Sequence, residues 1–357
     1  MIKILHTGDI HLDAGKDTYC LGILDAMLVR AKKEKVDALF LCGDLFHTKN
    51  DYLHNNKFRE SVIEKLNKCT DLFQIYYIPG NHEDHGGDFD SMKAFDWKQI
   101  EFMSKAKICI LEKDGETIEI AGIPHSRNYA GLFQGWKPSP KITKLRLALA
   151  HGAIPGFDFL GDEEPAGILT TTMFDRLEVD AVFLGHIHKS LEREIEERKY
   201  YYSGSLRPLR STETGPRSFN IISISDDTIH CAKQVFEESG QVRKYSRSLF
   251  EPEWQAFEPS NLHKNDHIIL NLEGITETQT ALEGGCNLIK QRITGLVREL
   301  EINSDNCVVV SNILGNNFVA KAHSKWLKAK PEDADEKELQ IWRMSFGLLH
   351  KYIKSHL

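Results

Sequence analysis

Short apolar runs alternate with amphipathic stretches in the first part of the chain. The runs at residues 3–7, 37–42 and 73–78 are brief and continuous, as in strands that are buried on both faces. Between them, apolar residues recur at helical spacing over residues 18–34 and again from Phe58 to Leu66. This βαβαβ order predicts a parallel or mixed sheet that is covered by helices.

The pattern then becomes richer in strands. Residues 125–141 contain Pro, Gly and aromatic residues, and they predict a long surface loop. The segments with the strongest strand pattern lie near residues 107–111, 117–123, 145–150, 180–184, 200–203 and 218–224.

A change of composition at residues 237–265 divides the chain into two expected domains. Residues 1–240 would form the larger one, and residues 241–357 a smaller α+β domain. The smaller domain would contain a strand at 267–272, a helix at about 286–300, a strand at 307–310 and a terminal helix at about 335–355. The expected fold class is therefore α/β (α+β).

Composition excludes some classes of protein. The net charge of −7 argues against a protein that coats nucleic acid by bulk positive charge, although it leaves room for a local basic patch. No apolar run is long enough to cross a membrane, and the N-terminus lacks the pattern of a signal peptide. The seven Cys form no CxxC pair, which predicts a reducing, cytoplasmic location.

Polar side chains follow five of the expected strands at the point where each strand ends, and most of them lie beside a glycine. Because ligands bind at the carboxyl ends of strands in an α/β sheet, we expect these side chains to converge on one site. Each group of residues alone is typical of an ordinary turn, but five such groups, each at the end of a strand, favour a site. The five groups are Asp9 and His11, Asp44 and His47, Asn81 and His82, His151, and His186 and His188.

The donor types point to divalent metal ions. Carboxylate, imidazole and amide oxygen ligands suit Mn²⁺, Fe²⁺ or Zn²⁺, and the lack of a thiolate argues against a structural zinc site. Two ions about 3.5–4 Å apart need a bridging carboxylate and several further ligands. Such a pair lowers the pKa of a shared water and clamps a phosphoryl group for in-line attack.

The five blocks of residues resemble the calcineurin-like metallophosphoesterase superfamily over residues 4–188. The resemblance implies a two-sheet sandwich flanked by helices. It further implies that Asp9, His11 and His188 bind one ion, that Asn81, His151 and His186 bind the other, and that Asp44 bridges them. His82 would orient the phosphate and protonate the leaving oxygen. We take Mn²⁺ as the first choice for both ions, with Fe²⁺ and Zn²⁺ as alternatives.

Two further features resemble the SbcD-type DNA repair nucleases within that superfamily. His47 matches a second active-site histidine of that branch, and Tyr201-Tyr202-Ser203-Gly204-Ser205 is similar to a block that follows the last metal ligands. The first block departs from the family pattern, because Asp13 stands where Gly is expected. The resemblance implies DNA as substrate, a C-terminal domain that caps the DNA side of the site, and an SMC-like (SbcC-type) ATPase as partner.

Basic residues near the expected cleft are candidate contacts to DNA phosphate: Arg127, Lys137, Lys141, Arg207 and Arg210. Each of them also fits an ordinary exposed residue. In the terminal helix, Leu339, Trp342, Phe346, Leu349 and Ile353 form an apolar stripe of coiled-coil period. The stripe would either pack on its own domain or dock on the ATPase partner, and the sequence leaves a homodimer open.

The leading hypothesis is a two-metal DNA nuclease that acts in double-strand-break repair, as an exonuclease and with endonuclease activity left open. A second hypothesis keeps the fold and replaces DNA by a small molecule or a phosphoprotein. A third is a non-catalytic scaffold for DNA ends, against which the intact set of ligands argues.

Overall fold

The computed structural model describes residues 1–84, 89–157, 168–251 and 253–309, with a few single residues beyond them. The chain divides into two compact units, one of Met1–Leu209 and Pro216–Ser239 and one of Arg210–Gly215 and Gly240–Leu357. That the second unit caps the site stays a prediction. Of the apolar stripe in the terminal helix, all positions except Trp342 lie outside the described residues.

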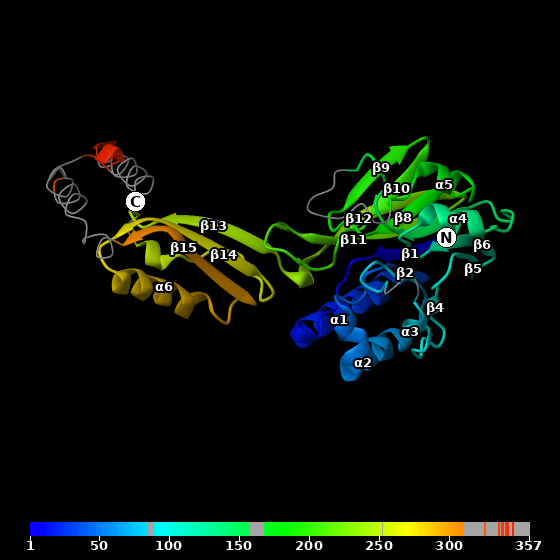
Figure 1. Ribbon diagram of the computed structural model, residues 1–357, viewed down its shortest axis with the longest axis horizontal. Helices are drawn as coiled ribbons and strands as arrows, with labels where there is room; N and C mark the ends of the chain where they lie inside the picture. The colour runs from blue at the N-terminus through cyan, green and yellow to red at the C-terminus, as the bar shows by residue number, and fades with distance from the viewer. Residues whose placement is uncertain are drawn as a thin grey trace. The chain divides into compact units, whose positions relative to one another are not determined.

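One six-stranded sheet of the first unit is built around the N-terminal strand (Figure 1). Its first four strands in sequence run parallel, and β11 and β12 extend the sheet in antiparallel fashion. In spatial order the strands are β12 (Thr228–Phe236), β11 (Arg217–Ser225), β1 (Ile2–Thr7), β2 (Ala38–Cys42), β3 (Gln74–Ile78) and β4 (Glu101–Phe102). The mixed sheet expected from the apolar pattern is confirmed.

The second sheet of this unit also has six strands, of which the central four run parallel. Its edge strands pair in antiparallel fashion. In spatial order the strands are β5 (Lys107–Lys113), β6 (Glu116–Ile123), β7 (Arg146–His151), β8 (Ala181–Gly185), β10 (Arg198–Tyr202) and β9 (Leu191–Ile195).

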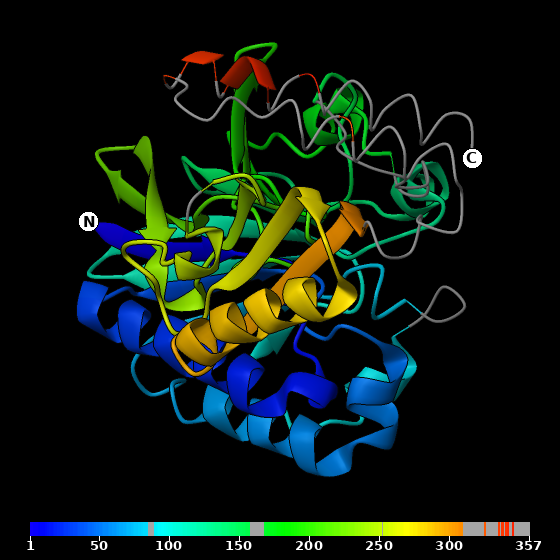
Figure 2. The same cartoon turned by 90° about the vertical axis from the view of Figure 1, so that its left-hand side faces the viewer.

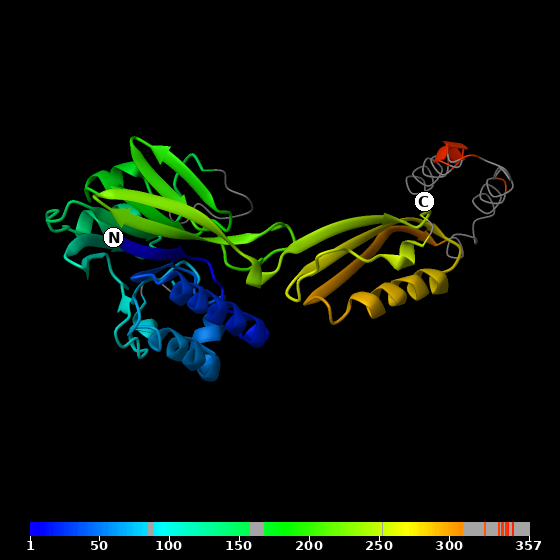
Figure 3. The ribbon, with the colours of Figure 1, turned by 180° about the vertical axis from the view of Figure 1, so that it is seen from behind.

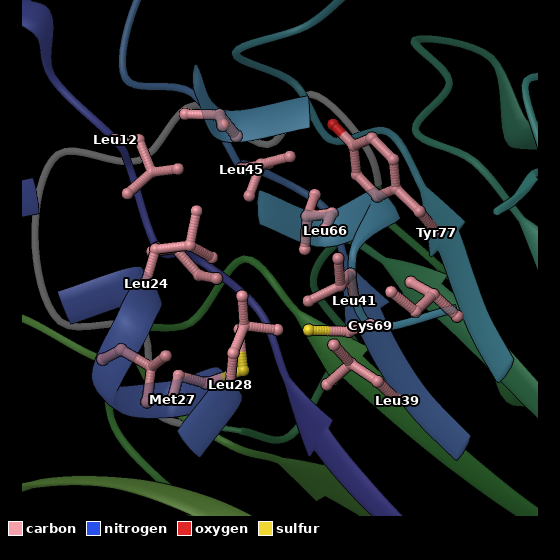
Figure 4. Close-up of a cluster of buried hydrophobic side chains, with 14 of the residues drawn as sticks. Leu12, Leu24, Met27, Leu28, Leu39, Leu41, Leu45, Leu66, Cys69 and Tyr77 are labelled. Carbon is pink, nitrogen blue, oxygen red and sulfur yellow. The ribbon is translucent and has the colours of Figure 1, made fainter. Parts of the chain in front are cut away.

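The two sheets pack face to face, and helices cover their outer faces. Phe40 of β2 and Phe183 of β8 meet in the apolar layer between the sheets. On the outer face of the first sheet, Leu24 and Leu28 belong to the same buried apolar cluster as Leu39 (Figure 4). In Figures 1 and 3, α1 and α2 lie together on that side. The helices of this unit are α1 (Asp17–Glu34), α2 (Asn56–Asn67), α3 (Asp90–Lys93), α4 (Tyr129–Gly135) and α5 (Thr171–Asp175). The predicted two-sheet sandwich is confirmed.

The second unit holds a parallel sheet of β13 (Val242–Ser248), β14 (His267–Thr276) and β15 (Glu299–Val309). The helix α6 (Gln279–Ile293) packs against β14 and β15 (Figure 2). It begins seven residues earlier than expected, because the Thr278 side chain caps its first turn by accepting from Ala281 N. The strand expected at 307–310 begins at Glu299.

The expected long loop at 125–141 is partly wrong, since α4 lies within it. Asn128 caps this helix by accepting from Gly131 N, and Tyr129 and Phe133 are buried against the outer face of the second sheet. The described part of the chain has no helix both long and apolar enough to span a bilayer.

Candidate metal centre

The side chains singled out in the sequence gather at one edge of the two sheets. Asp9 and His11 follow β1, Asp44 and His47 follow β2, and Asn81 and His82 follow β3. His151 ends β7, while His186 and His188 follow β8. The strand ends are joined across the two sheets, since Cys42 O of β2 lies 2.8 Å from His151 Nδ1 of β7.

Asp44 lies at the centre of this group. Its Oδ2 is 3.4 Å from Nε2 of His151, 3.6 Å from Nε2 of His11 and 3.9 Å from Nε2 of His82. The carboxylate is almost fully buried. One oxygen therefore faces imidazoles that come from both sheets, as a bridging ligand would.

On one side of Asp44, donor atoms of Asp9, His11 and His188 lie within 4.8 Å of one another. Nε2 of His11 is 3.2 Å from Nε2 of His188. Both oxygens of Asp9 lie 2.9 Å from the His186 backbone nitrogen, which holds this carboxylate in place.

On the other side, the Asn81 side chain meets two imidazoles. Its Oδ1 lies 2.9 Å from His151 Nε2 and 3.1 Å from His186 Nδ1. Because His151 donates from Nδ1 to the Cys42 carbonyl, the neutral ring carries its lone pair on Nε2. That lone pair faces the oxygens of Asn81 and Asp44. Lone pairs in this arrangement repel unless a proton or a cation lies between them, so these residues fit a metal ion.

Electrostatics favour a cation here as well. Burial would lower the pKa of His151, but Asp44 and Asp9 raise it to about 10. Burial raises the pKa of Asp9 to about 6. Burial, and then the neighbouring His151, lower the pKa of His186 to about 3, so this imidazole is neutral and able to bind a metal.

The backbone is strained at several of the residues that are proposed to bind metal. Asp9, His11 and Asp44 have φ of 51°, 50° and 51°, and His186 has φ of 99°. Such conformations cost about 1–3 kcal/mol each in non-glycine residues, and they cluster at functional sites. Neighbouring strand ends hold them, for example through Asp9 N and Gly43 O at 3.0 Å.

The glycines beside the ligands serve two different purposes. Gly43 has a φ of 83°, in the left-handed region, as a tight turn requires. Gly185 is not left-handed but is needed for space, because a Cβ there would lie 1.9 Å from Cys42 O. One glycine beside the ligands is therefore needed for its backbone conformation and the other for close packing.

The sequence assigns no role to Glu83, the residue directly after His82. Its buried carboxylate accepts from Asp44 N at 3.0 Å, Phe46 N at 2.9 Å and Gly80 N at 2.7 Å. Burial, and then the charge of Asp44, raise the pKa of Glu83 to about 7. The side chain ties the turn after β2 to the turn after β3. The only sign of this role in the sequence is that a carboxyl residue directly follows Asn81-His82.

Arg207, one of the candidate DNA contacts, is buried. Its guanidinium binds backbone carbonyls of the first unit. Its Nε donates to the carbonyls of Ile10 and His11 at 3.1 and 3.0 Å. The guanidinium therefore braces the strained turn after β1.

The other candidate DNA contacts differ in their surroundings. Lys141 forms an ion pair with Asp180 at 2.7 Å, and Arg127 lies 3.5 Å from the buried Asp84. Lys137 and Arg210 are exposed, the latter in the second unit. That these residues bind DNA stays a prediction.

His125, which follows β6, is buried beside the centre. Its Nε2 lies 3.5 Å from Asp84 Oδ2, and its ring is 6.2 Å from that of His151. His125 therefore lies next to the proposed metal ligand His151.

Residues 2–190 match the family model described as calcineurin-like phosphoesterase. The chain belongs to this family. It is 28% identical to the DNA double-strand break repair protein Mre11 of Methanosarcina acetivorans, over 66% of this chain and 38% of that protein. The metallophosphoesterase YhaO of Bacillus subtilis is 24% identical, over 64% of this chain and 59% of YhaO.

This phosphoesterase chain thus spans between 38% and 59% of the length of these relatives. Among solved structures, a dimetal phosphatase from Danio rerio superposes with a TM-score of 0.47 and 8% identity, over 66% of this chain and 96% of that one. The match of residues 2–190 to the family model confirms the resemblance to this superfamily that was inferred from the five groups of residues at the strand ends.

Proposed function

We propose that this chain is a metal-dependent DNA nuclease that hydrolyses phosphodiester bonds in the processing of double-strand breaks. The observation that carries the proposal is the arrangement of donors on both sides of Asp44 Oδ2. The similarity to Mre11 proteins supports DNA as the substrate class.

Two divalent ions, with Mn²⁺ the first choice, would be held by these donors. Asp9, His11 and His188 would hold one, Asn81, His151 and His186 the other, and Asp44 both. When bound, such a pair supplies an activated water and neutralises charge on the phosphoryl oxygens. Asp9 and Asp44 contribute two negative charges and the neighbouring Glu83 at most a third, against four positive ones, so the local field would attract phosphate although the chain as a whole is acidic.

His82 is suited to protonate the leaving oxygen. Its Nδ1 donates to the carbonyl of His47, which fixes the ring with Nε2 on the side of Asp44. The side chain is 36% exposed, so a substrate can reach it. A protonated His82 would donate from Nε2 to the oxygen that departs from phosphorus.

His47 lies beside His82, with ring centroids 5.8 Å apart and an interplanar angle of 20°. We assign it the positioning of the scissile strand. The exposed Lys137 and Arg210 would contact DNA phosphate, and an SMC-like ATPase would be the partner.

The test is an assay of the full chain, loaded with Mn²⁺, on linear duplex and single-stranded DNA. We expect Asp44→Asn to abolish hydrolysis and His82→Asn to lower kcat by about 10²–10⁴-fold, the usual contribution of a general acid. Asp71→Asn, at an exposed aspartate, is the matched control and should behave as wild type. Full activity of Asp44→Asn would contradict the two-ion site.

Two alternatives are outcomes of the same experiment. Hydrolysis of cyclic nucleotides or phosphopeptides without hydrolysis of DNA would indicate a phosphodiesterase or phosphatase for other substrates. DNA binding without hydrolysis of any of these substrates would indicate a scaffold for DNA ends.

A further inference from the structure

Three imidazoles from three neighbouring strand ends face one another at the rim of the centre. They belong to His11 after β1, His47 after β2 and His82 after β3, and one ring nitrogen of each lies within 4.8 Å of the other two. The ring centroids are 4.5 Å apart for His11 and His82 and 5.5 Å apart for His11 and His47. We call this group the three-histidine cluster.

The ring nitrogens of this cluster are available for a ligand. His82 donates from Nδ1 to the His47 carbonyl, so its neutral ring carries a lone pair on Nε2. Nδ1 of His11 and Nδ1 of His47 are buried without a hydrogen-bond partner among the described residues. Buried polar atoms normally have partners, so this shortage is itself a signal that something else binds here.

We propose that the three-histidine cluster is a separate cation position, selective for Zn²⁺ and chemically similar ions, whose occupancy inhibits the enzyme. The inhibitory part rests on the proposed function. An ion bound here takes His11 from the dinuclear centre and engages His47 and His82, so all three become unavailable for hydrolysis.

The selectivity follows from the donor atoms. Three imidazoles with an open fourth position are a known ligand set of zinc. Mn²⁺ prefers oxygen donors and binds a given site more weakly than Zn²⁺ does. The dinuclear centre adds the oxygens of Asp9, Asp44 and Asn81 to its imidazoles, whereas the three-histidine cluster consists of three imidazoles with the single carboxylate of Asp44 beside them. The preference for Zn²⁺ over Mn²⁺ is therefore larger at the three-histidine cluster than at the dinuclear centre.

The surrounding charge supports a cation at the cluster. Asp44 Oδ2 lies 3.6 Å from Nε2 of His11 and 3.9 Å from Nε2 of His82. The same buried carboxylate thus serves both positions. Because His11 and Asp44 are shared, we expect Zn²⁺ at the cluster to compete with the first Mn²⁺ rather than add to it.

The experiment titrates Zn²⁺ into the untagged, Mn²⁺-loaded full chain without DNA and follows released Mn²⁺ by its EPR signal. His47→Asn removes one donor of the cluster and none of those assigned to the dinuclear centre. We expect this variant to need more Zn²⁺ for the same release, by at least the roughly 10- to 100-fold that loss of an outer partner of a metal ligand costs. His54→Asn, at an exposed histidine, is the matched control and should titrate as wild type.

A second measurement covers the case in which the chain holds no Mn²⁺. Metal-free protein is titrated with Co²⁺, whose strong visible bands report four-coordinate binding, and these bands should be lost in His47→Asn and retained in His54→Asn. Equal Zn²⁺ and Co²⁺ titrations of the two variants would overturn the proposal. A failure of the proposed nuclease function appears separately, as absence of DNA hydrolysis, because neither binding measurement uses DNA.

Discussion

A single buried carboxylate, that of Glu83, connects two of the turns that carry proposed metal ligands. In Glu83→Gln the amide nitrogen replaces one acceptor oxygen and faces backbone N–H groups. Above its pKa of about 7 the Glu83 carboxylate is charged, and each hydrogen bond to a charged group contributes about 1.5–3 kcal/mol. We expect a loss of that size in the free energy of unfolding, measured with urea, and weaker Mn²⁺ binding, measured by calorimetry.

The matched control is Glu112→Gln, at an exposed glutamate, which should change neither quantity. If Glu83→Gln kept both the stability and the Mn²⁺ affinity of the wild type, the connecting role of Glu83 would be wrong.

His6 of β1 gives a prediction about acid stability. Its side chain is buried, and burial lowers its pKa from 6.5 to about 3. Between these values the unfolded chain binds a proton that the folded chain does not. Stability therefore falls as the pH falls through this window, by about 1.4 kcal/mol per pH unit from this residue.

His6→Gln removes this titration and keeps an acceptor for Asn220, whose Nδ2 lies 3.2 Å from His6 Nδ1. Urea unfolding of both proteins at pH 7 and pH 4.5 measures the effect. The variant should gain stability relative to the wild type as the pH falls, whatever its stability at pH 7. A difference between the two proteins that does not change with pH would refute the prediction.

At the scale of elements, the close approach of β8 and β2 depends on Gly185. A Cβ at this position would lie 1.9 Å from a backbone oxygen, that of Cys42, so the strand ends would have to separate. We expect Gly185→Ala to lower the free energy of unfolding by about 1–3 kcal/mol, as overpacking does, and to weaken Mn²⁺ binding.

Gly22→Ala is the matched control, because Gly22 lies on the exposed side of α1 with nothing within 4 Å of the added Cβ. It should raise stability by up to about 1 kcal/mol, the difference in helix propensity. If Gly185→Ala kept the stability and metal affinity of the wild type, the strand ends would accommodate the added Cβ, and the prediction would be wrong.

The elements that carry the proposed ligands were predictable because these buried parallel strands are mostly apolar and have glycine or proline at or directly after their ends. The strands β9, β12 and β13 were missed, since they alternate with charged residues, as in Leu191–Ile195, and give little apolar signal. Similarly, the convergence of the Asp, His and Asn side chains could be predicted from their positions at strand ends, whereas the contacts of Glu83 and Arg207 could not. Both bind backbone groups, and backbone partners leave no mark in the sequence.

At the scale of the whole molecule, every proposed metal ligand belongs to the first unit. A ligand that binds only the folded state stabilises it by about 2.7 kcal/mol at a hundred times its Kd. Mn²⁺ should therefore slow hydrogen exchange in β1–β3, β7 and β8 and leave β13–β15 unchanged, and EDTA should reverse the effect. Mass spectrometry of deuterated peptides from the full chain measures both units in one sample. Asp44→Asn should show no Mn²⁺-dependent protection, and protection confined to the second unit would place the metal site elsewhere.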